Sequence, residues 1–221
     1  MLERDFLFTQ PLIQMKKTAV LIDLGFALHK LHPLVGKRMP TAAEVRTFAV
    51  RCINPVDEEL FRIYCYCCTP YRETETHPLT RARVDFSATP TFAANDTLIR
   101  ELSVSDNVAF RAGELSFDGW MIKKRAAEEI AKTGRAITPD DFAPDLKQKR
   151  VDMKIGLDVA WLASKGIVER LILVAADSDF VPAMKFARRE GVQVILVTLG
   201  HKLVKRDLLV HADEVRSVAF P

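Results

Sequence analysis

Leu171-Ile-Leu-Val-Ala-Ala-Asp-Ser-Asp-Phe-Val-Pro182 is the stretch that decides the fold, because an apolar run passes directly into two aspartates and then into a helix-forming segment. A short apolar run with β-branched residues is typical of a central strand in a parallel sheet. Far upstream, Thr18-Ala-Val-Leu-Ile22 leads into Asp23 in the same way. Carboxylates at the carboxyl ends of such strands lie where open α/β sheets bind ligands. The two strands therefore predict an acidic rim, which suits a divalent metal and phosphodiester chemistry.

The composition is that of a globular chain. It has 221 residues, of which 48% are hydrophobic, and a mean hydropathy close to zero. No apolar run approaches the roughly 18 residues needed to cross a bilayer, and Met1-Leu-Glu-Arg-Asp5 does not resemble a secretory signal. We therefore expect a single domain over residues 1–221 in the cytoplasm, without contact to a membrane, and with a variable leader at residues 1–17.

Strands and helices are predicted to alternate along the chain. Strands are expected at 18–22, 60–68, 171–175 and 192–198, and helices at 41–53, 152–164 and 181–190, with a capping-box pattern at Thr41 and Glu44. Shorter elements are expected at 96–103 (helix), 108–115 (strand or hairpin), 120–132 (helix), near Lys202 (helix) and 215–220 (strand). Proline-rich segments at 69–97 and 138–147 are predicted to be a loop and a connector. The fold class is thus α/β, a mainly parallel central sheet flanked by helices, with an insertion at about 69–138.

Several other chemistries find no support in the sequence. The four cysteines (Cys52, Cys65, Cys67 and Cys68) lack a second ligand pair at zinc spacing, so we expect ordinary buried thiols in a reduced compartment. No glycine-rich phosphate loop and no Gly-x-Ser-x-Gly elbow is present. Haloacid-dehalogenase chemistry requires a second aspartate two residues after the first, where this chain has Gly25.

A third acidic position opens the helix predicted after Arg150. Its apolar stripe is formed by Ile155, Val159, Leu162 and Ala163. Asp152 falls inside this stripe at its N-terminal end, so the carboxylate needs a partner, and a metal is one such partner. The alternative is an acid favoured by the helix dipole alone. Asp158 lies about 120° round the helix, where it either joins the site or faces solvent.

Asp177 and Asp179 compete for two roles at the start of the next helix. Two residues apart, they share a side if the backbone stays extended. We predict that Asp179 caps the helix beginning near Val181, with Pro182 in its first turn, and that Asp177 is the metal ligand. Ser178 offers a hydroxyl to either role. Three or four converging carboxylates favour Mg²⁺ or Mn²⁺.

Basic residues surround the acidic segments. Lys149 and Arg150 precede the predicted helix, and Lys205 follows the last regular strand. Basic residues around an acidic centre would suit binding of a polyanion at the periphery and its cleavage at the centre. The alternative for each basic cluster is that it simply lies on a solvated surface. The formal net charge of +3 does not by itself indicate a binding partner. Among the scattered histidines, His201 is a candidate for substrate contact, although a surface histidine is the commoner outcome.

These motifs together resemble a known family. Val20-Leu-Ile-Asp23, the segment from Lys149 to Asp158, the segment from Leu173 to Pro182, and Ala187-Arg-Arg-Glu-Gly-Val-Gln-Val194 are similar to the NYN domain. This domain is a branch of the PIN-like nuclease superfamily that includes the LabA-like proteins. The likeness is specific from Lys149 to Val197, shorter at the first strand, and not traceable between residues 69 and 138.

The resemblance implies a Rossmann-like sheet and an endoribonuclease that depends on Mg²⁺ or Mn²⁺. It assigns metal binding to Asp23, Asp152 and Asp177, with Asp179 and Asp158 as supporting acids. One position departs from the family pattern: many members have asparagine three residues after the first aspartate, and here Phe26 stands there. A phenyl ring forms no hydrogen bond with phosphate or water, so efficiency or substrate choice is expected to differ.

Three functions follow as alternatives. The first is a metal-dependent endoribonuclease acting on RNA, preferably single-stranded, with Lys149, Arg150, Ser178 and Lys205 binding the substrate. The second is a non-catalytic module that holds RNA or a protein on the same fold, and the third is a structural or regulatory subunit. Exposed strand edges and the inserted segment are compatible with a homodimer.

Overall fold

The structure, a computed structural model, describes residues 14–201 and 203–220. Residues 1–13 of the predicted leader lie outside the described residues. Its strands are β1 (Lys16–Asp23), β2 (Glu58–Cys68), β3 (Thr74–Thr76), β4 (Arg83–Asp85), β5 (Val108–Ile122), β6 (Phe142–Lys149), β7 (Arg170–Val174), β8 (Gln193–Val197) and β9 (Glu214–Val215). Its helices are α1 (Leu24–Leu31), α2 (Ala42–Arg51), α3 (Pro90–Ser103), α4 (Lys124–Thr133), α5 (Val151–Ser164), α6 (Val181–Arg189) and α7 (Arg206–Val210). Short 3-10 turns are η1 (Phe86–Ala88), η2 (Pro139–Asp141) and η3 (Ser178–Phe180).

Seven strands form the central sheet, in the order β6-β5-β2-β1-β7-β8-β9. All neighbouring pairs are parallel except β5 and β6, which are antiparallel. The predicted fold class is confirmed. The chain adds β2 on one side of β1 and later adds β7 on the other side, so β1 and β7 flank the point where the strand order reverses. In open α/β sheets ligands bind outside the carboxyl ends of the strands at such a point.

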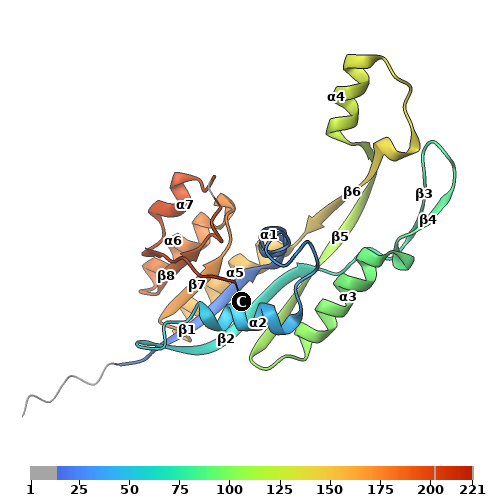
Figure 1. Cartoon of the computed structure of the whole chain (residues 1–221). Coiled ribbons are helices and arrows are strands. Elements are labelled where there is room, and N and C mark those ends of the chain that lie inside the picture. The colour runs from blue at the N-terminus through green and yellow to red at the C-terminus, as the bar shows by residue number, and fades with distance from the viewer. Residues whose placement is uncertain (1–13, 202, 221) are drawn as a thin grey trace, which may run out of the picture.

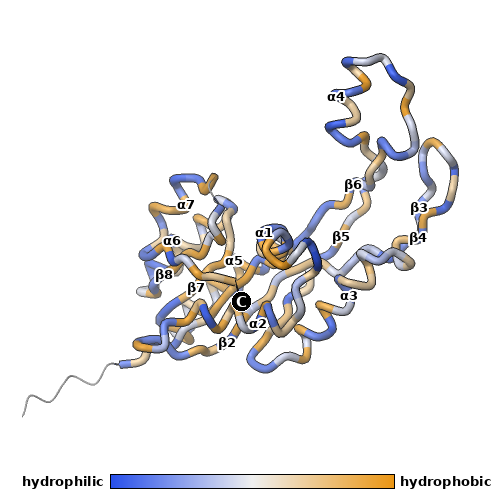
Figure 2. The backbone as a smooth tube through the Cα atoms, in the orientation of Figure 1, coloured by the Kyte–Doolittle hydropathy of each residue, from blue (hydrophilic) through white to orange (hydrophobic). Residues whose placement is uncertain are grey.

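Helices cover the sheet (Figure 1), and two apolar layers pack on it, one on each face. Alternate residues of β1 divide between them: Ala19 and Leu21 face α5 and α6, while Val20 and Ile22 face α1 and α2. Figure 2 shows hydrophobic residues concentrated in these strands and in the helices packed on them. The capping box predicted for α2 is present, since the Thr41 hydroxyl accepts from the Glu44 amide at 3.2 Å.

Strands β5 and β6 continue beyond the sheet as an arm, defined here as residues 114–149 (Figure 1). The prediction of a helix over 120–132 was wrong at its start, because β5 runs to Ile122 and pairs there with Phe142. The prediction of a connector at 138–147 was also wrong. Pro144 lies in β6, an edge strand, where a residue without an N–H group is tolerated.

The proline-rich segment 69–97 is more regular than predicted. It forms the β3–β4 hairpin and the first part of α3, which begins at Pro90 rather than near residue 96 because proline is well suited to the first helical turn. The hairpin packs on the arm through His77, whose ring centroid lies 4.8 Å from that of Trp120. The predicted insertion therefore supplies β5, an inner strand of the sheet.

The C-terminal segment differs from prediction in detail. Among the described residues, the last helix is α7, which begins at Arg206, and residue 202 lies outside them. The final strand, predicted at 215–220, is only β9, paired with β8 through Glu214 and Val215. The residues that follow still pack on the sheet, since Val218 and Phe220 contact the apolar layer that includes Phe48.

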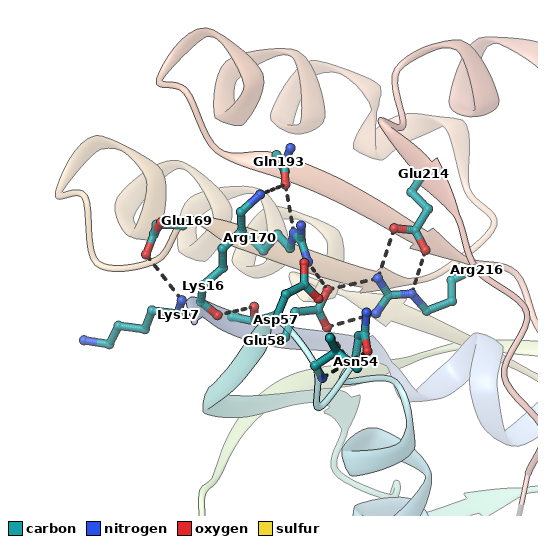
Figure 3. Close-up of polar contacts among 12 residues, drawn as sticks. Lys16, Lys17, Asn54, Asp57, Glu58, Glu169, Arg170, Gln193, Glu214 and Arg216 are labelled. Atoms are coloured by element: carbon teal, nitrogen blue, oxygen red, sulfur yellow. Dashed lines mark hydrogen bonds and ion pairs between the residues drawn. The ribbon is translucent and has the colours of Figure 1, made fainter. Parts of the chain in front are cut away.

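A network of charged side chains closes the amino edge of the sheet (Figure 3). Glu58, whose side chain is fully buried, accepts hydrogen bonds from Arg170 at 2.6 Å and from Arg216 at 2.9 and 3.0 Å. Burial raises the pKa of Glu58, but the bonds from Arg216, from the Asn54 amide and from Arg170 outweigh it and hold the pKa below its usual range. The network thus ties together β2, β7 and the segment that follows β9.

Within the described residues, none of the helices is long and apolar enough to span a membrane. The four cysteines are free thiols, three of them buried. Burial raises the pKa of Cys65 to about 12, so this thiol is unreactive at neutral pH.

Candidate active site

Asp23 and Asp177 meet at the carboxyl edge of the sheet, where β1 and β7 end side by side. Asp23 continues the alternation of Ala19 and Leu21, so its side chain lies on the face covered by α5. Ala175, two residues before Asp177, belongs to the same apolar layer. The two acids therefore point toward the same end of the same face.

Asp152 reaches this edge from the first turn of α5. Arg150 makes the turn from β6 into α5 with a positive φ of 71°, which places the start of the helix beside the sheet edge. The prediction that Asp152 faces the core was wrong, because its side chain is exposed. Val151 and Ile155 are the buried residues of this first part of α5, and Asp152 projects from between them to solvent.

The three carboxylates repel one another. Burial raises the pKa of Asp23, and the charges of Asp152 and Asp177 raise it further, against hydrogen bonds from the amides of Phe26 and Gly25. Partial desolvation also raises the pKa of Asp152, with contributions from Asp177 and Asp179. A neighbouring positive charge would therefore favour the ionised forms of Asp23 and Asp152.

The prediction that Asp179 caps the helix beginning near Val181 was wrong, and the capping side chain at this turn is Asp177. Asp177 accepts from the Asp179 amide at 3.0 Å and caps the 3-10 turn η3, which the sequence pattern did not distinguish from the helix. Helix α6 then begins at Val181 with Pro182 in its first turn, as predicted, and no side chain caps it. Asp179 is exposed beside the cluster.

Asp158 does not lie with the other acids. Its Oδ2 accepts a hydrogen bond from the Tyr66 hydroxyl at 2.8 Å and one from Arg111 Nε at 3.0 Å. It therefore neither joins the acidic edge nor faces solvent, the two outcomes expected from sequence. Instead it ties α5 to β2 and β5.

A cleft of about 400 Å³ opens beside Asp23 and Asp177. Its other walls include Phe26 and His201, whose rings meet edge to face at 6.0 Å between centroids. Across the cleft, Lys205 Nζ donates to the Ser178 hydroxyl at 2.9 Å. The structure thus brings together the predicted Ser178, Lys205 and His201 with two of the acids.

The remaining predicted residues are placed differently. Lys149 is exposed at the end of β6, and Arg150 forms an ion pair with Glu114 on the arm. Gln148 was not predicted: its amide lies 2.9 Å from where a Cβ at Gly25 would stand, and Asp23 Oδ1 lies 3.2 Å from that point. No sequence signal marked it, because β6 was predicted to be a connector.

The residue types at this edge are those that bind a hard divalent cation. Carboxylate oxygens are its preferred ligands, and Asp23, Asp152 and Asp177 form no ion pair with any described lysine or arginine. Within residues 14–201 and 203–220, no three His, Cys, Asp or Glu side chains are grouped so that they could hold a metal ion. The residue types therefore fit the ion, although the described side chains are not grouped as a ligand shell.

Replacing Asp152 by asparagine is expected to stabilise the metal-free protein at neutral pH. A pKa raised in the fold means that the fold binds protons more tightly than the unfolded chain does, so stability falls as pH rises from the ordinary value of 3.8 through the raised value. The gain should be roughly 1–2 °C in Tm, since exposed substitutions usually change stability by less than about 0.5 kcal/mol. Thermal melts in EDTA across the acid and neutral range test this.

Asp106→Asn is the control variant for these melts. Asp106, exposed before β5 at the opposite edge, should show no such gain when replaced by asparagine. The gain for Asp152→Asn should vanish at acid pH, where the carboxyl is already protonated. A gain that persists there, or one shared by Asp106→Asn, would exclude mutual repulsion as its cause.

Comparison with known proteins supports the resemblance noted from sequence. Residues 116–219 match the family model of the NYN domain, a range that contains Asp152, Asp177 and Asp179. A solved structure of a protein of unknown function from Vibrio parahaemolyticus is similar with a TM-score of 0.51 at 17% identity, over 93% of this chain and 94% of that one. At this identity the likeness shows the fold alone. A search of curated proteins gave no match.

Proposed function

We propose that this NYN-domain protein is a metal-dependent endoribonuclease that hydrolyses phosphodiester bonds of single-stranded RNA. The observation that carries the proposal is that Asp23, Asp152 and Asp177 lie near one another at the point where the strand order reverses. Repulsion among these carboxylates, which helps raise the pKa of Asp23 and of Asp152, is destabilising without a cation. Placed at the ligand-binding edge of an α/β sheet, they mark a functional site.

In this proposal Asp23, Asp152 and Asp177 hold Mg²⁺ or Mn²⁺, with Asp179 as a supporting acid. A bound divalent ion would supply activation of water and stabilisation of charge on the scissile phosphate. Lys205 lies across the cleft and supplies a positive charge for a phosphate oxygen, and its bond to Ser178 fixes its position. Lys149, exposed at the start of the α5 turn, extends the basic rim along the RNA backbone.

Phe26 gives this cleft an apolar wall. Its ring packs against His201, so a base or ribose entering the cleft meets an aromatic edge where many family members have an amide. The cleft is therefore suited to contacts with nucleotide rings rather than to a further hydrogen bond to phosphate. Substrate choice is expected to depend on this pair.

Cleavage of a labelled single-stranded RNA by the purified protein tests the proposal. With Mn²⁺ or Mg²⁺ the RNA should be cut internally, and with EDTA it should stay intact. A labelled single-stranded DNA of the same sequence shows whether the ribose hydroxyl is needed. Cutting that continues unchanged in EDTA would contradict a metal-dependent reaction.

A second candidate is an RNA-binding module that does not cut. It is favoured by the spacing of the acids, of which no three described side chains are grouped to hold an ion, and by Phe26 in the cleft. On this alternative RNA binds equally well in EDTA and in Mn²⁺, and no product forms. Thermal melts separate the two candidates, because an ion that binds the native state raises Tm.

A further inference from the structure

A second cavity, of about 340 Å³, lies between α3 and the base of the arm. Its floor is the carboxyl end of β2 at Cys67 and Cys68, the strand next to β1. It has the size of a small-molecule site and is lined mainly by apolar groups, as such sites are. The acids of the proposed active site do not line it.

Aromatic side chains form one wall of this cavity. They are Tyr71, Phe86 and Phe92, all partly exposed. The rings of Tyr71 and Phe86 meet edge to face at 5.4 Å between centroids, and the Tyr71 hydroxyl donates to Glu75 Oε1 at 2.5 Å. These two contacts hold Tyr71 and Phe86 in position at the cavity.

The arm contributes both apolar and polar groups to the lining. Leu115 and Leu146 supply apolar surface, and Gln148 supplies an amide. Within the described part of the chain, the Gln148 side chain has no hydrogen-bond partner. An amide with a free donor pair and acceptor is suited to reading the edge of a planar heterocycle.

Gln148 also connects this cavity to the acidic edge. It lines the cavity and, at the same time, lies beside Gly25 next to Asp23 Oδ1. On the outer rim, the Arg72 guanidinium stands over the Phe92 ring at 5.9 Å. A chain with a planar ring in the cavity would thus meet a positive charge on one side and the carboxylates on the other.

We propose that this cavity is a nucleobase subsite, which takes one unpaired base of the RNA substrate and thereby sets which bond reaches Asp23. The inference rests on the proposed function. Single-stranded RNA is recognised by splayed bases that stack on aromatic rings and bond through their edges, and the cavity supplies both kinds of contact. The aromatic wall stacks on the base, and Gln148 contacts its edge.

The test uses a short single-stranded RNA carrying 2-aminopurine, whose fluorescence falls when the base stacks. Binding is measured in EDTA, so that no cutting occurs. Thr91 is exposed at the cavity wall, and Thr91→Trp fills the cavity without altering the core. The matched control is Thr97→Trp, on the same helix but about 240° round its axis.

Wild type and Thr97→Trp should quench the 2-aminopurine. Thr91→Trp and Phe92→Ala should lose the quenching and bind about 5- to 100-fold more weakly, the loss expected for one stacked base. Equal quenching and affinity in all four proteins, with Mn²⁺-dependent cutting retained, would overturn the subsite and leave the nuclease standing. If wild type neither binds nor cuts RNA, the subsite and the proposed function fall together.

Discussion

Replacing Asp23 and Asp177 together by asparagine is expected to abolish metal-dependent cutting of RNA, a loss of more than about 100-fold. The estimate is conservative, because loss of partners that only orient metal ligands already costs roughly 10- to 100-fold in affinity or activity. Asparagine keeps the shape of each side chain and removes the charge that holds the cation. The measurement is the rate of product formation in Mn²⁺ by wild type and variant at equal concentration.

The matched control for the double variant is Asp158→Asn. This acid lies on α5 but bonds to Tyr66 and Arg111 rather than to the cluster. We expect it to keep Mn²⁺-dependent cutting while losing some stability. Thermal melts with Mn²⁺ complete the assignment: the ion should raise the Tm of wild type and Asp158→Asn, but not of the double variant. If the double variant still cuts, the assignment of the site is wrong.

Replacing Glu58 by alanine is expected to destabilise the fold by about 3–5 kcal/mol, the usual cost of removing one partner from a buried ion pair. The change leaves two nearly buried guanidinium groups, Arg170 and Arg216, without their shared carboxylate. For a chain of this length the loss corresponds to a fall of roughly 10 °C in Tm. Thermal or urea unfolding of the purified variant measures it.

Glu214 provides the control for this prediction. It also pairs with Arg216, but its side chain is 48% exposed, so Glu214→Ala should cost less than about 1 kcal/mol. Folded Glu58→Ala should keep its RNA-cutting rate at low temperature, because the network lies at the edge of the sheet opposite the acids. A Tm within 1 °C of wild type for Glu58→Ala would show that the network contributes little.

Much of the sheet could be predicted because its inner elements repeat one local pattern. β1, α5, β7, α6 and β8 each combine an apolar run or stripe with a clear boundary residue. The acids at the ends of β1 and β7 follow directly, since parallel strands bring their carboxyl ends to one edge. The position of Asp23 and Asp177 at the carboxyl edge of the sheet could therefore be predicted from the sequence.

The arm could not be predicted, because its order comes from pairing between distant segments. Gly119 and Pro144 resemble chain breakers in the sequence, yet both lie inside the β5–β6 ladder. Gly119 has a φ of 106° where the register shifts between Phe117 and Trp120, which is a β-bulge. Only the cross-strand partner shows that such a residue belongs to a strand.

The same limit applies to single side chains. Asp158 was predicted to bind metal or face solvent, and its partners come from β2 and β5, far away in the sequence. Gln148 became a candidate only once β6 brought it beside Gly25. Local periodicity predicts which face of a helix or strand a residue lies on. It does not predict which side chain of another element that residue contacts.

The way the arm joins the sheet limits how this architecture can diverge. β5 and β6 pass from sheet to arm without a linker, and near the base Leu115 and Gln148 already line the proposed subsite. The outer portion, residues 123–138, touches neither the acids nor that cavity. Related proteins can therefore differ in the outer portion, or lack it, while the acids and the proposed subsite are retained. A deletion at the base instead removes an inner strand and the entry into α5, so a workable boundary for recombination lies partway along the arm.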